Sequence, residues 1–194
     1  MNERAVSVTP AEADALRGWV EREGARQTIE VGLGYGVSAL AVCEGLRANG
    51  AGGGARHVVI DPFQETRFGG AGLRLLEEAD MAPLVELHPE ESQLVLPRLV
   101  TEGRRFDLAV LDAGHRFDAV FVDLVYLGRL VRPSGIVFVD DYQLPAVARA
   151  ASFCTTNLGW SVEEVSAPDE LHQWAVLRTP EAPPERRFDH FVDF

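Results

Sequence analysis

Short apolar runs rich in β-branched residues alternate along the chain with segments of helical periodicity. Five such runs predict strands, each followed by a helical pattern, and they cover residues 28–31, 57–60, 84–87, 107–111 and 136–139. This alternation is typical of a parallel sheet with helices on both faces. Two later runs, WSVEEV and QWAVLR, flank the turn-rich SAPDELH and predict an antiparallel hairpin. We therefore expect an α/β fold with about seven strands, mostly parallel, closed by a C-terminal antiparallel hairpin.

Two helical segments can be predicted in more detail. In TPAEADALRGWVERE, Thr9 is placed to cap a helix, Pro10 to occupy its first position and Glu12 to complete a capping box. Further along, apolar residues recur at steps of three and four: Phe117, Val120, Phe121, Leu124, Leu127 and Val131. This stripe predicts a helix that packs its apolar face against the core.

The length favours a single domain. A chain of 194 residues, 46% of them hydrophobic, can bury one sizeable core but is short for two. We expect one domain over residues 1–194, with an N-terminal helical extension at 1–26 and a proline-rich tail at 179–194. The aromatic end of the tail is expected to pack back or to contact another subunit. The glycine-rich NGAGGGARH predicts a flexible loop before the second strand.

Charge and cysteine usage narrow the class of partner. The formal net charge of -12 leaves no basic field for a polyanion, so nucleic acid is not an expected partner. The segment MNERAVSVTP lacks the apolar core of a secretory signal, and no apolar run approaches the roughly 18 residues of a membrane span. We expect a cytoplasmic protein that does not enter a membrane. Cys43 and Cys154 lie alone in helical segments, which is typical of reduced, buried thiols.

A glycine-rich turn follows the first predicted strand in TIEVGLGYGVSAL. Glycines there permit positive φ angles and let a ligand approach the backbone closely. A dinucleotide would favour G-x-G-x-x-G, and Gly34, Gly36 and Ala39 fit the variant that ends in alanine, so the glycines alone do not select the ligand. Glu30 adds a carboxylate at the strand end. It would repel a pyrophosphate but suits a ligand with an ammonium group and a sulfonium.

The E-x-G-x-G-x-G pattern formed by Glu30, Gly32, Gly34 and Gly36 resembles the cofactor motif of class I S-adenosylmethionine-dependent methyltransferases. The resemblance implies a Rossmann-like sandwich and S-adenosylmethionine as cofactor. Asp61 ends the run HVVID, 25 residues after Gly36, where that fold places an acid on the ribose hydroxyls. Because dinucleotide enzymes also carry an acid in a similar place, Asp61 supports both cofactors.

The third predicted strand is followed by ESQLVLP. This segment resembles the catechol O-methyltransferase-like branch, in which a Ser-Gln pair at the start of the next helix contacts the adenine. The resemblance implies that Ser92 and Gln93 hold the adenine. Alternatively, Ser92 only caps the helix.

Three acids end the fourth and fifth predicted strands, DLAVLD and GIVFVDD. Because the carboxyl ends of parallel strands line the ligand crevice of an open α/β sheet, Asp112, Asp140 and Asp141 should converge there. Three carboxylates with no nearby Lys or Arg repel one another unless a cation lies between them. A divalent ion, Mg²⁺ by default, prefers such oxygen ligands. The alternative is that Asp140 and Asp141 are only turn or cap residues.

This arrangement resembles the metal site of the catechol O-methyltransferase-like and macrolide-sugar O-methyltransferase groups. The resemblance implies Asp112 as the first ligand and Asp140 with Asp141 as the pair, although catechol-type enzymes have Asn where Asp141 stands. His115 occupies the position of their Lys base. A His can accept a hydroxyl proton near neutral pH, so His115 is expected to act as base, metal ligand or helix cap. Asp123, eight residues further on, is expected to be a solvated or capping charge.

Together these features predict S-adenosylmethionine-dependent O-methylation of a small hydroxylated molecule, assisted by a divalent metal. His115 and Asp112 are the expected catalytic residues, and Asp112 is also assigned to the cofactor. Two alternatives stay open: an NAD-dependent oxidoreductase on the same sheet, and a non-catalytic binding module that retains the fold. A homodimer is a further possibility, with the segment FDHFVDF as a contact between subunits.

Overall fold

A computed structural model of the chain describes residues 8–50, 54–168, 172–185 and 187–194. The N-terminal residues 1–7, the glycine-rich 51–53 and residues 169–171 of SAPDELH lie outside the described residues. The corresponding parts of the predicted extension, loop and hairpin turn are therefore not tested.

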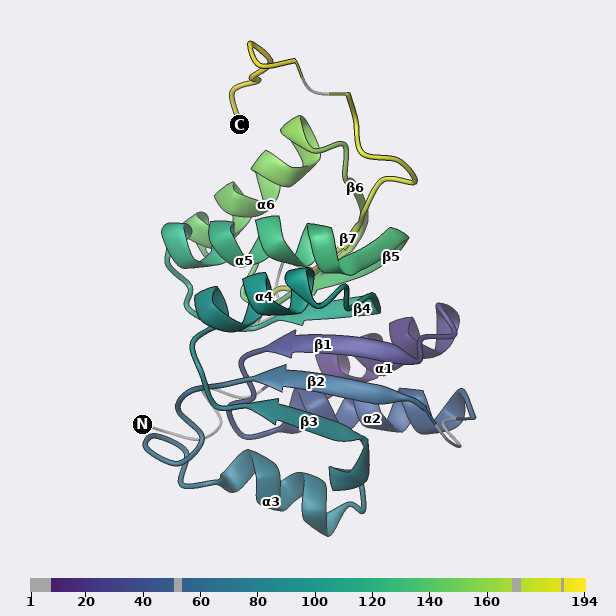
Figure 1. Cartoon of the computed structure of the whole chain (residues 1–194). Helices are drawn as coiled ribbons and strands as arrows, with labels where there is room; N and C mark the ends of the chain where they lie inside the picture. Colours follow the sequence, from purple (N-terminus) through teal and green to yellow (C-terminus); the bar gives the residue numbers. More distant parts are fainter. Residues whose placement is uncertain (1–7, 51–53, 169–171, 186) are drawn as a thin grey trace.

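In the described part of the chain, seven strands form a single sheet in the order β3-β2-β1-β4-β5-β7-β6 (Figure 1). The strands are β1 (Gln27–Val31), β2 (Arg56–Ile60), β3 (Val85–His88), β4 (Phe106–Leu111), β5 (Val131–Val139), β6 (Ser161–Val165) and β7 (Ala175–Arg178). The first five pair in parallel, whereas β7 pairs antiparallel with both β5 and β6. The predicted seven-stranded sheet with a closing antiparallel hairpin is confirmed.

Among the described residues, six α-helices flank the sheet (Figure 1). They are α1 (Pro10–Arg22), α2 (Val37–Ala48), α3 (Ala71–Glu78), α4 (Ser92–Thr101), α5 (Phe117–Leu130) and α6 (Pro145–Asn157), and a 3₁₀ turn, η2 (Ala82–Leu84), precedes β3. Helices α4, α5 and α6 pack on one face, and α1 and α2 pack on the other. Among the described residues, no helix is long and apolar enough to cross a membrane.

The alternation of side chains along each strand explains the two cores. Ile29 and Val31 point toward the α4–α6 side, whereas Leu108 and Val110 point toward α1 and α2. Both faces of the central strands are buried, so their sequences are almost continuously apolar.

The start of α1 and the apolar stripe of α5 agree with the sequence pattern in most positions. The Thr9 hydroxyl accepts a hydrogen bond from the backbone N–H of Glu12 at 3.2 Å, as expected of a cap. In α5, Val120, Leu124 and Leu127 are buried. The prediction that Phe117 belongs to the core is wrong, since it is 40% exposed and its ring stacks on the tail instead.

The C-terminal tail leaves the sheet and packs back on α5 and α6. The ring of Phe194 lies 6.4 Å from that of Phe117 and 5.1 Å from that of Phe153. The Asn157 side chain donates to the Val192 carbonyl and accepts from its N–H, both at 2.8 Å. The prediction that the aromatic end packs back is confirmed.

Both cysteines are buried and unbridged. Burial raises the pKa of the Cys43 and Cys154 thiols to about 12, so neither forms a thiolate readily. The prediction of reduced, buried thiols is confirmed.

Candidate functional site

A cavity of about 430 Å³ opens at the carboxyl ends of β1, β2 and β4. Its size is in the usual range for small-molecule sites. The predicted cofactor residues on its wall are Gly32, Gly34, Asp61, Ser92, Gln93 and Asp112. His115 also lines it. The structure therefore brings together residues from the turns after β1, β2, β3 and β4, as expected for a ligand crevice at the switch point of an open sheet.

The three glycines of the turn after β1 serve different purposes, although all have positive φ angles of 97°, 51° and 84° at Gly32, Gly34 and Gly36. A Cβ on Gly32 would lie 2.0 Å from the backbone oxygen of Asp112, so this glycine lets the turns after β1 and β4 pack together. A Cβ on Gly34 would meet no atom within 4 Å, which leaves room on the cavity wall. Gly36 packs against Gly72 and does not line the cavity.

Glu30 is the predicted cofactor residue whose side chain is turned away from the cavity. It is fully buried, and both carboxylate oxygens are engaged, one by the hydroxyl of Ser38 and the other by Nε2 of His57 at 2.8 Å. His57 Nδ1 in turn lies 2.9 Å from the Thr28 hydroxyl. Glu30 therefore ties β1 to β2 and to the start of α2. The sequence suggested that Glu30 presents its charge to a ligand in the cavity. In the structure its carboxylate is turned to these neighbouring elements instead.

Asp61 organises the floor of the cavity. Its Oδ2 accepts hydrogen bonds from the backbone N–H groups of Leu33 and Gly34, both at 3.1 Å, and from the Gln64 amide at 2.8 Å. Its Oδ1 accepts from the Phe63 N–H at 2.7 Å. One carboxylate thus holds the turn after β2 against the glycine turn after β1. Gln64 is a participant that the sequence motifs did not identify.

Ser92 and Asp123 face each other at the end of the cavity formed by α4 and α5. Ser92 is the first residue of α4, and its side chain lies near the Asp123 carboxyl. Asp123 is 3% exposed and lines the cavity, so the expectation of a solvated charge is wrong. Burial raises the pKa of Asp123 to about 6, although the nearby Ser92 side chain opposes that rise. The sequence contained a signal for this burial, because Asp123 follows Val120 by three residues and so lies on the apolar face of α5.

Asp123→Asn is expected to stabilise the free protein, and more so at higher pH. A carboxyl whose pKa rises from 3.8 to about 6 on folding loses stability as the pH rises through this interval, whereas Asn does not titrate. The free energy of unfolding of the variant should exceed that of the native protein by roughly 3 kcal/mol at pH 8. The excess should be roughly 1 kcal/mol smaller at pH 5. Urea unfolding at both pH values measures it.

Asp118→Asn is the matched control, because Asp118 lies on the same helix with 79% of its side chain exposed. It should show no such dependence. An Asp123→Asn excess that is equal at pH 5 and pH 8 would contradict the prediction.

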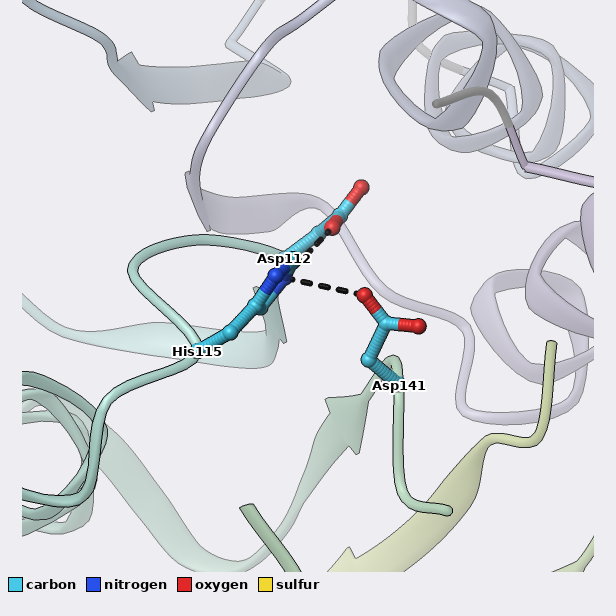
Figure 2. A group of neighbouring side chains, drawn as sticks. All are labelled: Asp112, His115 and Asp141. Atoms are coloured by element: carbon cyan, nitrogen blue, oxygen red, sulfur yellow. Dashed lines mark ion pairs between the residues drawn. The ribbon is translucent and has the colours of Figure 1, made fainter. Parts of the chain in front are cut away.

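Asp112, His115 and Asp141 form a compact group beside the cavity (Figure 2). The turns after β4 and β5 supply these side chains. His115 Nε2 lies 3.0 Å from Asp141 Oδ2 and 3.8 Å from Asp112 Oδ1. His115 and Asp141 both have positive φ angles, 42° and 52°, an unusual conformation for residues other than glycine. Such strained residues gather at functional sites, because the surrounding structure has to hold them in place.

The neighbouring acids favour the protonated form of His115. The Asp112 carboxyl raises the pKa of His115, an effect that burial opposes and Asp141 reinforces. Burial raises the pKa of Asp112 itself, while the nearby His115 lowers it. An imidazole whose pKa is raised by neighbouring acids is suited to accept a proton near neutral pH.

Asp140 does not belong to the close group and lies near Glu12 of α1. It is 7% exposed, and its Oδ1 accepts from the backbone N–H of Asp141 at 2.6 Å. Burial raises the pKa of Glu12 to about 10, and the Asp140 carboxyl is the next cause of this rise. Neither oxygen of Glu12 has a hydrogen-bond partner of ordinary geometry among the described residues, so the predicted capping box is not completed.

His172 is a second residue that the sequence did not identify. Its Nδ1 lies 3.4 Å from Asp141 Oδ1, so the two histidines His115 and His172 flank the same carboxylate. His172 precedes β7, which runs antiparallel to β5. This pairing brings the start of β7 to the carboxyl end of β5 and places His172 at the site.

The group could hold a divalent metal. The ligand atoms of Asp112, His115 and Asp141 all lie within 4.8 Å of one another, a spread that one ion at about 2.0–2.6 Å from each would span. Carboxylate oxygens dominate the set, and Asp140 supplies another nearby, which favours a hard cation such as Mg²⁺.

The family model described as "Methyltransferase domain" matches residues 29–142. A Mycobacteroides abscessus protein named "Putative O-methyltransferase" is 33% identical over 134 residues, which are 68% of this chain and 57% of that protein. The chain thus spans less than two thirds of the length of this curated relative.

Two solved structures share the fold. The O-methyltransferase TomG from Streptomyces achromogenes, involved in tomaymycin synthesis and solved with S-adenosylmethionine, has a TM-score of 0.76 at 20% identity, covering 90% of this chain and 82% of TomG. An O-methyltransferase from Bacillus cereus, solved with S-adenosylhomocysteine, has a TM-score of 0.75 at 17% identity, covering 90% of this chain and 83% of that chain. At these identities the likeness concerns the fold.

Proposed function

Because the chain belongs to the class I S-adenosylmethionine-dependent methyltransferase family, we propose that it transfers a methyl group to a hydroxyl oxygen of a small molecule, with a divalent metal assisting. One observation carries the proposal. Asp112 lines the cavity and also belongs to the Asp112–His115–Asp141 group. A cofactor in the cavity and an acceptor held at the group would therefore meet at this residue.

The residues of the cavity suit the parts of S-adenosylmethionine. Asp61 would accept hydrogen bonds from the ribose hydroxyls, and Ser92 with Gln93 would meet the adenine, joined by the buried Asp123. Gly32 and Gly34 allow the cofactor to approach the backbone. Glu30 contributes indirectly, because its bonds to Ser38 and His57 fix the strand from which the glycine turn starts. When bound, the cofactor supplies a methyl carbon that its sulfonium already activates for displacement.

The acids and His115 would prepare the acceptor. Asp112, Asp140 and Asp141 would hold the metal, with Asp140 joining from outside the close group. A bound metal lowers the pKa of a hydroxyl that it contacts. His115 would take the hydroxyl proton, and Asp141 would orient the imidazole through the 3.0 Å contact. Alignment of the nucleophile with the methyl carbon is the main task left to the protein.

Calorimetric titration with S-adenosylhomocysteine and with NAD, each with and without Mg²⁺, tests the cofactor. Binding of S-adenosylhomocysteine but not NAD is expected, and the reverse would contradict the proposal. A screen of phenols, sugars, amines and carboxylic acids for methyl transfer from labelled S-adenosylmethionine then tests the reaction. Transfer to hydroxyl acceptors that chelation of the metal abolishes is expected; transfer that persists with a chelator would remove the metal from the proposal.

A further inference from the structure

Helix α1 carries a carboxyl on its buried face. Leu16, Trp19 and Val20 of this face pack into the core, and Glu12 lies one turn before Leu16 on the same side of the helix. An apolar residue would be expected at such a position. Glu12 is instead only 1% exposed, and it lies in the first turn, the end of α1 that is closest to the acids after β4 and β5.

The surroundings of Glu12 do not satisfy its carboxyl. Neither oxygen has a hydrogen-bond partner among the described residues. The polar groups near the carboxyl are the Thr9 backbone N–H of its own helix end and the Asp140 carboxyl. No Arg or Lys side chain forms an ion pair with Glu12 in the described part of the chain. The nearest charged groups are the carboxyls of Asp140 and Asp112. Buried carboxylates that face other carboxylates are costly unless a cation joins them.

We propose that Glu12 is an additional oxygen ligand of the divalent cation that Asp112, Asp140 and Asp141 bind. The inference rests on the metal-assisted reaction proposed above. It explains two observations together: the buried carboxyl on α1 that lacks a hydrogen-bond partner, and its nearness to the Asp140 carboxyl, which does not belong to the close group. Glu12 and Asp140 lie outside the close group, so binding would draw their carboxylates toward the cation held by Asp112. The cation would then satisfy the oxygens of all three, and four acidic side chains suit a hard ion. The N-terminal helix would thereby form one wall of the metal site.

Titration of the full chain with Mn²⁺, followed by calorimetry or by the electron paramagnetic resonance signal of free Mn²⁺, tests the inference. Glu12→Gln keeps the size of the side chain and removes its charge. It should weaken Mn²⁺ binding by at least about tenfold, the scale on which even loss of an outer-shell partner weakens a metal site. Affinity for S-adenosylhomocysteine without metal should stay within about twofold, because Glu12 does not line the cavity.

Glu21→Gln is the matched control, since Glu21 is an exposed acid on the same helix and its loss should leave Mn²⁺ binding unchanged. A purely structural Glu12 predicts a different pattern, in which Glu12→Gln lowers the thermal unfolding temperature of the metal-free protein while Mn²⁺ binding stays native. If Glu12→Gln does not fold, as judged by its circular dichroism spectrum, Glu12→Asp decides: a shorter acid should weaken Mn²⁺ binding without weakening the binding of S-adenosylhomocysteine.

The possible failures are distinguishable. Native Mn²⁺ affinity in Glu12→Gln overturns the inference about Glu12 and leaves the proposed function intact. Absence of Mn²⁺ binding by the native protein overturns both this inference and the metal part of the proposed function. Weakened S-adenosylhomocysteine binding with native Mn²⁺ binding would instead assign the carboxyl to the ammonium group of the cofactor.

Discussion

Asp112→Asn is expected to lower the rate of methyl transfer by about 100-fold or more at saturating cofactor. Asp112 is the residue at which the cavity and the acidic group meet, and its carboxylate faces His115 across 3.8 Å. Asn has nearly the same shape but carries no charge. Asn would bind a cation more weakly and would favour a protonated His115 less. Loss of general acid–base catalysis typically lowers the rate by about 10²- to 10⁴-fold. The measurement is the initial rate with the best acceptor from the screen.

The control for this prediction is Asp118→Asn, a change of the same kind at an exposed position six residues further along. It should keep the native rate. Titration with S-adenosylhomocysteine should accompany the kinetics, because a variant that still binds the product but does not transfer the methyl group separates catalysis from cofactor binding. A rate for Asp112→Asn within about threefold of the native one would show that Asp112 does not take part.

Asp61→Ala is expected to have the largest effect on both stability and cofactor binding. The substitution removes the acceptor of four hydrogen bonds at once and leaves the N–H groups of Leu33, Gly34 and Phe63 without a partner in a mostly buried place. Each such donor costs about 1–3 kcal/mol, and the effects are not additive, so we expect a loss of roughly 3 kcal/mol or more in the free energy of unfolding. Affinity for S-adenosylhomocysteine should fall at least about 100-fold.

Urea unfolding and calorimetry measure the two effects. Glu65→Ala, a change at an exposed acid in the same turn, is the control and should leave both quantities close to native. If Asp61→Ala does not fold, Asp61→Asn, which retains one acceptor oxygen, should show the same losses to a smaller degree. Full cofactor affinity in a folded Asp61 variant would contradict the assignment of this residue to the ribose.

The fold could be predicted to a large extent because its signals are local. Buried parallel strands appear in the sequence as continuous apolar runs. The polar turn between WSVEEV and QWAVLR predicts the antiparallel hairpin. The same is true of the glycines and of Asp61, whose position after a strand follows from the order of the elements. Strand ends in an open sheet meet at one edge, so the convergence of Asp112 and Asp141 could also be expected.

The roles that could not be predicted depend on partners distant in sequence. Glu30 looks like a ligand contact in the sequence, but in the structure its carboxylate is hydrogen-bonded to His57 on the neighbouring strand. His172 appears isolated until the pairing of β7 with β5 brings it to Asp141. From the sequence, Glu12 is interpreted as a capping residue, because Asp140 is far away in the chain and nothing near α1 indicates that the two will be neighbours. Asp123 is different, since its place on the apolar face of α5 was visible and its burial could have been inferred.

The strand order also sets the length of any molecule that uses both parts of the site. Asp61 follows β2 and Asp112 follows β4, with β1 between them. Neighbouring strands lie about 4.8 Å apart, so the two carboxylates stand two spacings, or roughly 10 Å, apart. Backbone hydrogen bonds fix this span, whereas the turns that carry Asp112, His115 and Asp141 can change without altering it. During evolution, the acceptor of such a protein can therefore be exchanged through substitutions in two turns while the cofactor keeps its place.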